Sequence, residues 1–130
     1  MKRAPAAAAV LVSLVSAAAA PLLAAGKPSL NVYFQKTLTD AAYQKKVFDK
    51  VAKLWKIPAS LPAVGRKTVV QAVIARDGKL ASAMVTMESG AKAWDDAALA
   101  AVKAAAPFDP LPKAYGFPSV EVHFHVALAP

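Results

Sequence analysis

Apolar residues recur along this chain with two spacings, one typical of helices and the other typical of strands. Between residues 40 and 55 they return every three or four residues, at Val47, Phe48, Val51, Leu54 and Trp55. This spacing places them on one face of an amphipathic helix. Thr39 or Asp40 can cap the first turn of that helix, and Pro58 stops it soon after Trp55.

A hairpin and a second helix are predicted next. Residues 67–76 are rich in β-branched side chains, Asp77-Gly78 is a dipeptide favoured in tight turns, and residues 80–88 form the returning strand. Ser89-Gly90 ends that strand. A helix is then predicted over residues 92–105, with Asp95 and Asp96 in the first turn, where negative charge meets the positive end of the helix dipole.

A last strand is predicted over residues 119–128, after Pro107, Pro110 and Pro112 have ended the second helix. The connecting helix makes this strand run parallel to the second hairpin strand, so it pairs antiparallel with the first one instead. The pattern therefore predicts an α+β fold with the order helix-strand-strand-helix-strand. Its three-stranded antiparallel sheet has the order 2-1-3, two helices pack on one face, and both outer strands are free edges.

The N-terminal residues 1–26 have the layout of a secretory signal peptide. Lys2 and Arg3 precede an uncharged stretch rich in Ala, Val and Leu, and small residues at 24–26 offer a cleavage site. An uncleaved membrane anchor is the alternative, because the stretch is long enough to span a bilayer as a helix. The predicted organisation is a signal peptide or anchor over 1–26, a short arm over 27–39 and one domain over 40–130.

Composition and motifs argue against several classes of function. The chain has no cysteine, which excludes disulfides and thiolate zinc sites, and its net charge falls from +8 to +6 without Lys2 and Arg3. It contains no nucleophile motif and no Gly-rich phosphate loop, so neither an enzyme activity nor a cofactor is predicted. Lys46, Lys50 and Lys53 line the outer face of the first helix without interleaved aromatics, which favours a solvated face over phosphate or lipid binding. Nucleic acid is not an expected partner.

One arrangement resembles a metal site. His123 and His125 lie two residues apart in the last predicted strand, so their imidazoles share a face, and Glu121 continues the row. Zinc or copper usually requires three or more protein ligands. The other interpretation is a solvent-facing row, with the alternating apolar residues of the same strand in the core. A periplasmic metal-binding protein that uses His123, His125 and Glu121 is therefore the alternative function.

The second half of the chain contains the segment RDGKLASAMVTMESGAKAWDDAALAAVKAAAPFDPLP, followed by VEVHFHV. This segment resembles the C-terminal domain of the TonB/TolA family of periplasmic energy transducers. The shared features are Asp77-Gly78, Ser89-Gly90, Trp94-Asp95, the Ala-rich stretch 97–101, and Pro107-Phe108 with Pro110 and Pro112. The preceding LWKIP also fits, so the likeness covers residues 43–126. The chain departs from the family in lacking a His within residues 4–26 and a long periplasm-spanning segment, which puts energy transduction in doubt.

This resemblance implies a noncatalytic periplasmic protein-binding module, with a link to envelope transport or energy transduction. Members of the family bind a peptide segment of a periplasmic or outer-membrane protein by strand addition to the last strand. The corresponding residues here are Val120, Glu121, Val122, His123, Phe124, His125 and Val126. Free edges also pair with themselves, which makes a homodimer a second expected assembly. The resemblance implies a periplasmic location, or inner-membrane anchoring, and hence membrane contact, if residues 1–26 are retained.

Overall fold

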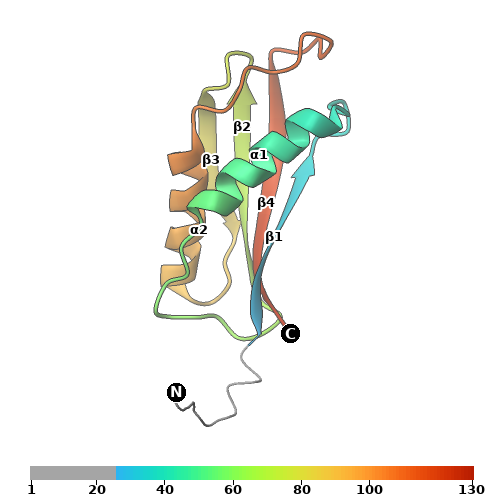
Figure 1. Cartoon of the computed structure of the whole chain (residues 1–130). Helices are drawn as coiled ribbons and strands as arrows, with labels where there is room; N and C mark the ends of the chain where they lie inside the picture. The colour runs from blue at the N-terminus through green and yellow to red at the C-terminus, as the bar shows by residue number, and fades with distance from the viewer. Residues whose placement is uncertain (1–25) are drawn as a thin grey trace, which may run out of the picture.

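The computed structural model describes residues 26–130, and the predicted signal peptide lies outside it apart from Gly26. The described chain contains four strands and two helices (Figure 1). Their bounds are β1 Lys27–Phe34, α1 Ala41–Leu54, β2 Lys67–Ala75, β3 Leu80–Met87, α2 Lys92–Ala105 and β4 Ser119–Ala129. Neither helix in residues 26–130 is long and apolar enough to cross a membrane.

The four strands form one antiparallel sheet in the order β1-β4-β2-β3. β4 pairs with β2 along residues 119–127. On its other side, β4 pairs with β1 along residues 122–129. The last strand of the chain is therefore an interior strand, and the outer strands of the sheet are β1 and β3.

This topology corrects the predicted sheet. The predicted order is right for β3, β2 and β4, but the number of strands is four, and the free edge assigned to the last strand is covered by β1. β1 lies within residues 27–39, which were predicted to be a short arm. Its partly buried residues Leu30, Val32 and Phe34 alternate, but the exposed Tyr33 between two of them masks the two-residue period. Pro28 lies near the start of β1, where proline is tolerated because the strand forms an edge of the sheet.

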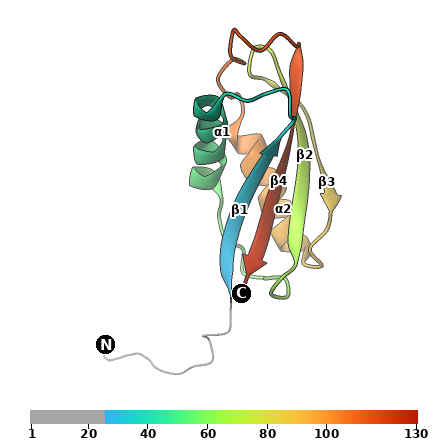
Figure 2. The same ribbon diagram turned by 90° about the vertical axis from the view of Figure 1, so that its right-hand side faces the viewer.

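Both helices lie on the same face of the sheet (Figure 2). α1 starts after Asp40, whose Oδ1 accepts a hydrogen bond from the Tyr43 N–H at 3.0 Å. The buried face of α1 carries Tyr43, Val47 and Val51, and α1 lies beside β1 while α2 lies beside β2 and β3. The α+β class, with two helices and an antiparallel sheet, is confirmed.

Alternation along β4 divides its side chains between the core and the open face of the sheet. Val120, Val122 and Phe124 are 0% exposed and Val126 is 4% exposed. Glu121, His123 and His125 point to the other face and are half-buried. β4 therefore contributes to the hydrophobic core with one face and to the surface with the other.

Candidate partner-binding site

The seven residues predicted to bind a partner form the middle of β4, and burial separates them into two groups. The inward group, Val120, Val122, Phe124 and Val126, belongs to the core and offers a partner only its backbone. The outward group, Glu121, His123 and His125, keeps side chains at the surface of the sheet. Any recognition by side chains at this site must therefore come from the outward group.

The backbone edge of β4 that faces away from β2 is paired with β1. Asn31 lies opposite His125, and Tyr33 lies opposite His123. Gln35 extends this pairing past the end of β1, because its N–H donates to the Glu121 carbonyl at 3.0 Å and its Oε1 accepts from the Glu121 N–H at 3.1 Å. The position that a partner strand would take on β4 is thus filled by the chain's own N-terminal strand.

β1 packs less completely than the strand it covers. Every residue of β1 is exposed or half-buried, whereas the inward residues of β4 are fully buried. An apolar groove of about 240 Å³ lies between β1 and α1. Pro28, Ser29 and Leu30 line its β1 side, and Phe48, Val51 and Trp55 line its α1 side. The side chains of β1 therefore leave unfilled space against the helix.

The outward side chains of β4 make specific polar contacts. His123 Nε2 lies 2.6 Å from Glu121 Oε2, and His125 Nδ1 lies 3.1 Å from Lys67 Nζ. The rings of Tyr33 and His125 meet in a T-shaped contact with centroids 4.6 Å apart. Burial is the main cause that lowers the pKa of His125, and the charges of Lys67 and His123 lower it further. At neutral pH, His125 is therefore an uncharged ring beside β1.

The geometry gives no support to the metal alternative. Among residues 26–130, no three His, Asp or Glu side chains lie where they could share one metal ion. Glu121 pairs with His123, while His125 contacts the ammonium group of Lys67 and the ring of Tyr33. The row Glu121, His123 and His125 is occupied by these contacts rather than arranged around one point.

The motif residues behind the family resemblance act in the fold rather than at the site. Trp94 Nε1 donates to the Val126 carbonyl at 3.0 Å, and Asp95 Oδ1 accepts from Thr68 Oγ1 at 2.5 Å and from the Ser89 N–H at 2.9 Å. Burial by itself would raise the pKa of the Asp95 carboxyl group. The hydrogen bonds from Thr68 and Ser89, together with the charge of Lys92, outweigh burial and leave that pKa below its ordinary value. These contacts fix α2 against the sheet.

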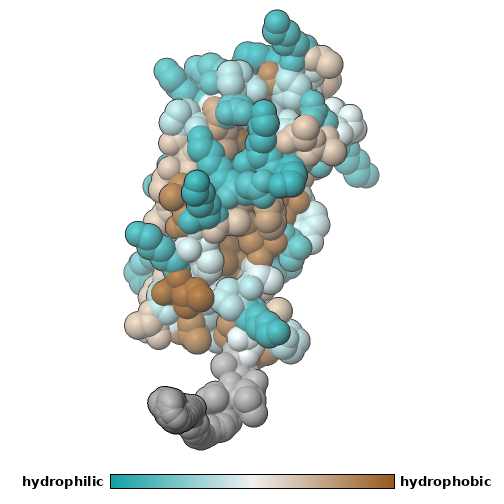
Figure 3. All heavy atoms as spheres, viewed as in Figure 1, coloured by the Kyte–Doolittle hydropathy of each residue, from teal (hydrophilic) through white to brown (hydrophobic). Residues whose placement is uncertain are grey.

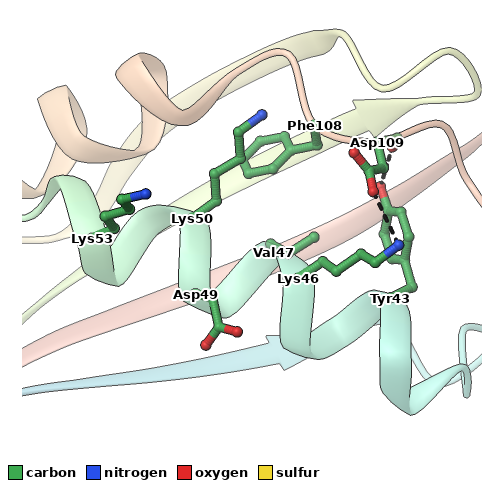
Figure 4. Close-up of a pocket in the computed structure, with 8 residues that line it drawn as sticks. All are labelled: Tyr43, Lys46, Val47, Asp49, Lys50, Lys53, Phe108 and Asp109. Atoms are coloured by element: carbon green, nitrogen blue, oxygen red, sulfur yellow. Dashed lines mark hydrogen bonds and ion pairs between the residues drawn. The ribbon is translucent and has the colours of Figure 1, made fainter.

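A second groove lies on the outer side of α1, between its lysines and the segment after α2 (Figure 4). Lys46 Nζ is 3.3 Å from Asp109 Oδ2, and Lys50 donates to the Pro107 carbonyl beside the ring of Phe108. Tyr43 donates to the Asp109 carbonyl at 2.9 Å, and burial followed by the charge of Asp109 raises its pKa to about 12. The phenol stays protonated at neutral pH, and two of the three lysines in the predicted basic row are held by intramolecular contacts.

Sequence reasoning missed both β1 and the apolar groove beside it. The one available signal was the alternation of Leu30, Val32 and Phe34, which is a short pattern next to a proline. The groove depends on how β1 and α1 meet, and no local pattern carries that information. Within the predicted site, the outward side chains of β4 lie at the surface, while the backbone edge of β4 is covered by β1.

The structure defines an α+β domain with two helices on one face of an antiparallel sheet, in which β1 covers the last strand. The chain belongs to the TonB C-terminal family, whose model, described as TonB C terminal, matches residues 40–126. The predicted resemblance is thereby confirmed. No curated protein and no solved structure matches the chain. TonB C-terminal domains are noncatalytic, envelope-associated modules that bind partner proteins. The match begins after β1 has ended.

Proposed function

We propose that this protein is a noncatalytic periplasmic binding module that takes up an extended segment of a periplasmic or outer-membrane protein on β4, in the place of β1. The observation that carries this proposal is the position of the family match, because residues 40–126 exclude β1. Within those residues the sheet has the order β4-β2-β3, and Val120–Val126 form an edge. β1 is the segment that closes this edge in the free protein.

Strand exchange replaces the backbone hydrogen bonds between β1 and β4 with equivalent bonds to the partner strand. The partner's main chain restores the hydrogen bonds that β4 loses when β1 leaves, so the exchange changes little in backbone pairing. The difference in affinity then comes from side chains. β1 leaves an apolar groove against α1, and a partner with larger inward side chains gains contacts there. This favours a partner whose apolar residues alternate as Leu30, Val32 and Phe34 do.

Selectivity on the open face is assigned to Glu121, His123 and His125. These side chains flank the exchanged strand, as they now flank Asn31 and Tyr33. A partner residue that packs against the uncharged ring of His125 would fit this surface, as Tyr33 does through its T-shaped contact. Two copies of the chain that exchange β1 would form the homodimer already expected from the sequence, and gel filtration at increasing protein concentration measures it.

Export depends on residues 1–26, and their fate distinguishes two forms of the same function. Cleavage gives a freely diffusing periplasmic module, and retention gives an anchored one. Mass spectrometry of the mature N-terminus decides between the two. A link to envelope transport rests on the family alone, and it requires identification of the partner.

A reversible lock on β1 tests the exchange. Ser29 and Ala127 lie opposite each other and the chain has no native cysteine, so Ser29→Cys with Ala127→Cys allows one disulfide between β1 and β4. The probe is a labelled peptide with the sequence of residues 27–34. The reduced double variant should bind the peptide as the unmodified chain does, and the oxidised form should lose binding. Equal binding by both forms would show that β4 is not the docking strand.

The partner itself can be sought with the same pair of states. A photo-crosslinking residue in place of His123 should capture envelope proteins in the reduced variant and not in the oxidised one. A proline within β4 is a poorer test, because β4 also pairs with β2 and the fold would suffer.

A further inference from the structure

One end of the domain exposes apolar side chains next to basic ones. Beyond the middle of α1, exposed apolar residues continue into the connection to β2, and they are 36–58% accessible. This group, named here the apolar tip, consists of Leu54, Ile57, Leu61 and Val64. Hydrophobic atoms are visible over the segment that follows α1 at the lower left of Figure 3, with hydrophilic atoms on either side.

The backbone at the C-terminal end of the apolar tip, next to Val64, is held by hydrogen bonds. The Arg66 N–H donates to the Ala63 carbonyl at 3.0 Å, and the Gly65 N–H donates to the Leu128 carbonyl at 2.7 Å. The Leu128 N–H in turn donates to the Arg66 carbonyl at 3.2 Å, and Pro62 is buried. Apolar side chains held at the surface by an ordered backbone are typical of an interaction surface.

The chain segment that carries the apolar tip has charged side chains of one sign. From Lys50 to Arg76 the sequence contains six basic residues and no acidic one. Lys53, Lys56 and Arg66 are exposed, and within residues 26–130 none of these three has a carboxylate within 4.0 Å. The basic side chains of this segment are therefore available to an anionic partner.

The N-terminal segment joins the domain at the same place. Gly26 lies against the apolar tip, since a Cβ added to it would be 3.1 Å from Val64 Cγ2. Figure 1 shows the start of β1 and the connection from α1 to β2 at one end of the sheet. The uncharged, apolar residues 4–25 therefore precede the domain directly at its apolar and basic end.

We propose that the apolar tip docks on an anionic lipid bilayer. Apolar side chains surrounded by Lys and Arg are the pattern of interfacial membrane binding, in which the apolar groups enter the acyl boundary and the cations meet headgroup phosphates. Ile57 and Leu61 are the inserting side chains, and Lys53 and Lys56 are the headgroup contacts. An acidic protein partner with apolar side chains is the competing occupant, and the absence of any shift at position 61 on anionic vesicles would favour it.

Docking of this kind is independent of strand exchange on β4. Lipid docking applies to both forms of the protein. If residues 1–26 are retained, the domain starts at the membrane; if they are removed, the apolar tip is the membrane contact. Failure of the peptide experiments on β1 would not affect it, and failure of lipid docking would leave the strand exchange unchanged.

A single labelled cysteine tests the proposal in the full chain, which has no native cysteine. The variant Leu61→Cys carries an environment-sensitive nitrobenzoxadiazole label, and the probes are vesicles of phosphatidylcholine with or without phosphatidylglycerol. The label should shift to the blue and brighten on the anionic vesicles, and this change should decrease at high salt. The matched control is Phe117→Cys, which replaces an exposed apolar residue beyond the other end of the sheet and should show no shift.

Neutralising lysines gives the quantitative arm. Lys53→Gln and Lys56→Gln should each raise the lipid concentration at half-maximal shift about fivefold, whereas Lys113→Gln should leave it unchanged. Residues 1–26 have the same sequence in every variant, so a difference between variants reports on the substituted lysine. The proposal is overturned by equal shifts at positions 61 and 117, by equal shifts on both kinds of vesicle, or by lysine variants that match the parent chain.

Discussion

Weakening the packing of β1 should tighten the binding of an extended peptide to β4 while it lowers the stability of the fold. The change is Leu30→Ala, because Leu30 packs against the core from a half-buried position in β1. Removing three carbon atoms of a fully buried side chain costs about 2.4 kcal/mol, and half-burial reduces this to about 1 kcal/mol. The loss falls on the state in which β1 is paired, so release of β1 becomes about fivefold easier.

Two measurements on the full chain check this expectation. Fluorescence anisotropy with the labelled peptide of residues 27–34 should give an apparent Kd about fivefold lower for Leu30→Ala, and urea unfolding should give a free energy about 1 kcal/mol lower. The control is Val102→Ala, which truncates a fully buried residue of α2. It should lose at least as much stability and keep the parent affinity for the peptide.

The expected result is that Leu30→Ala gains affinity for the peptide while it loses stability, whereas Val102→Ala loses stability without any gain in affinity. An unchanged or weaker affinity in Leu30→Ala would mean that β1 does not compete with the peptide. The incoming strand would then use an outer edge, such as that of β3, and the role assigned to Val120–Val126 would be wrong.

Asp95→Asn should lower the free energy of unfolding by about 2 kcal/mol, since the buried carboxylate accepts two hydrogen bonds, one of them from Thr68; urea unfolding measures it. Because the pKa of Asp95 is lowered in the folded state, its stabilisation is present above the unfolded pKa of about 4 and is lost as the pH falls further, so the Asn variant should show a flatter acid response. Gly78→Ala should lower the melting temperature, because φ is +90° and the added Cβ would collide with the Phe108 carbonyl; a melting curve equal to that of the parent would contradict this. For His125, a lowered pKa means that protonation favours the unfolded chain, so stability should fall as the pH drops below the unfolded value of about 6.5, and His125→Gln should reduce that fall; identical pH profiles would remove His125 from the explanation.

The sequence carried enough information for the helices, the hairpin and the face of each residue in β4. Alternation assigned Val122 and Phe124 to the core and His123 to the surface, and the structure agrees. It could not count the neighbours of β4. A strand at an edge and a strand with two partners show the same alternation. The side chains depend on which face of the sheet is buried, whereas pairing at the edges uses backbone groups that nearly all residues share.

The missing strand is the reason that the candidate site changed in character. β1 lies at the edge of the sheet, where half of its backbone groups face solvent and a proline is tolerated, so its sequence is under weaker constraint than that of a central strand. A central strand would have shown a longer apolar pattern than Leu30, Val32 and Phe34. The property that hid β1 from sequence reasoning, its shallow burial, is also the property that the proposed exchange requires.

The family motifs and the partner-selecting residues occupy different parts of this molecule. Trp94 and Asp95 attach α2 to the sheet, and Gly78 accepts the Phe108 N–H at 2.8 Å through its carbonyl. Each of these contacts closes a turn or fixes a helix. None of these motif contacts involves the side chain of His123 or His125. The fold can therefore be recognised from residues that do not select a partner, and two members of the family can share every motif while binding different segments. For this chain the selective positions are predicted to be the outward row of β4 and the residues of β1 that a partner must outcompete.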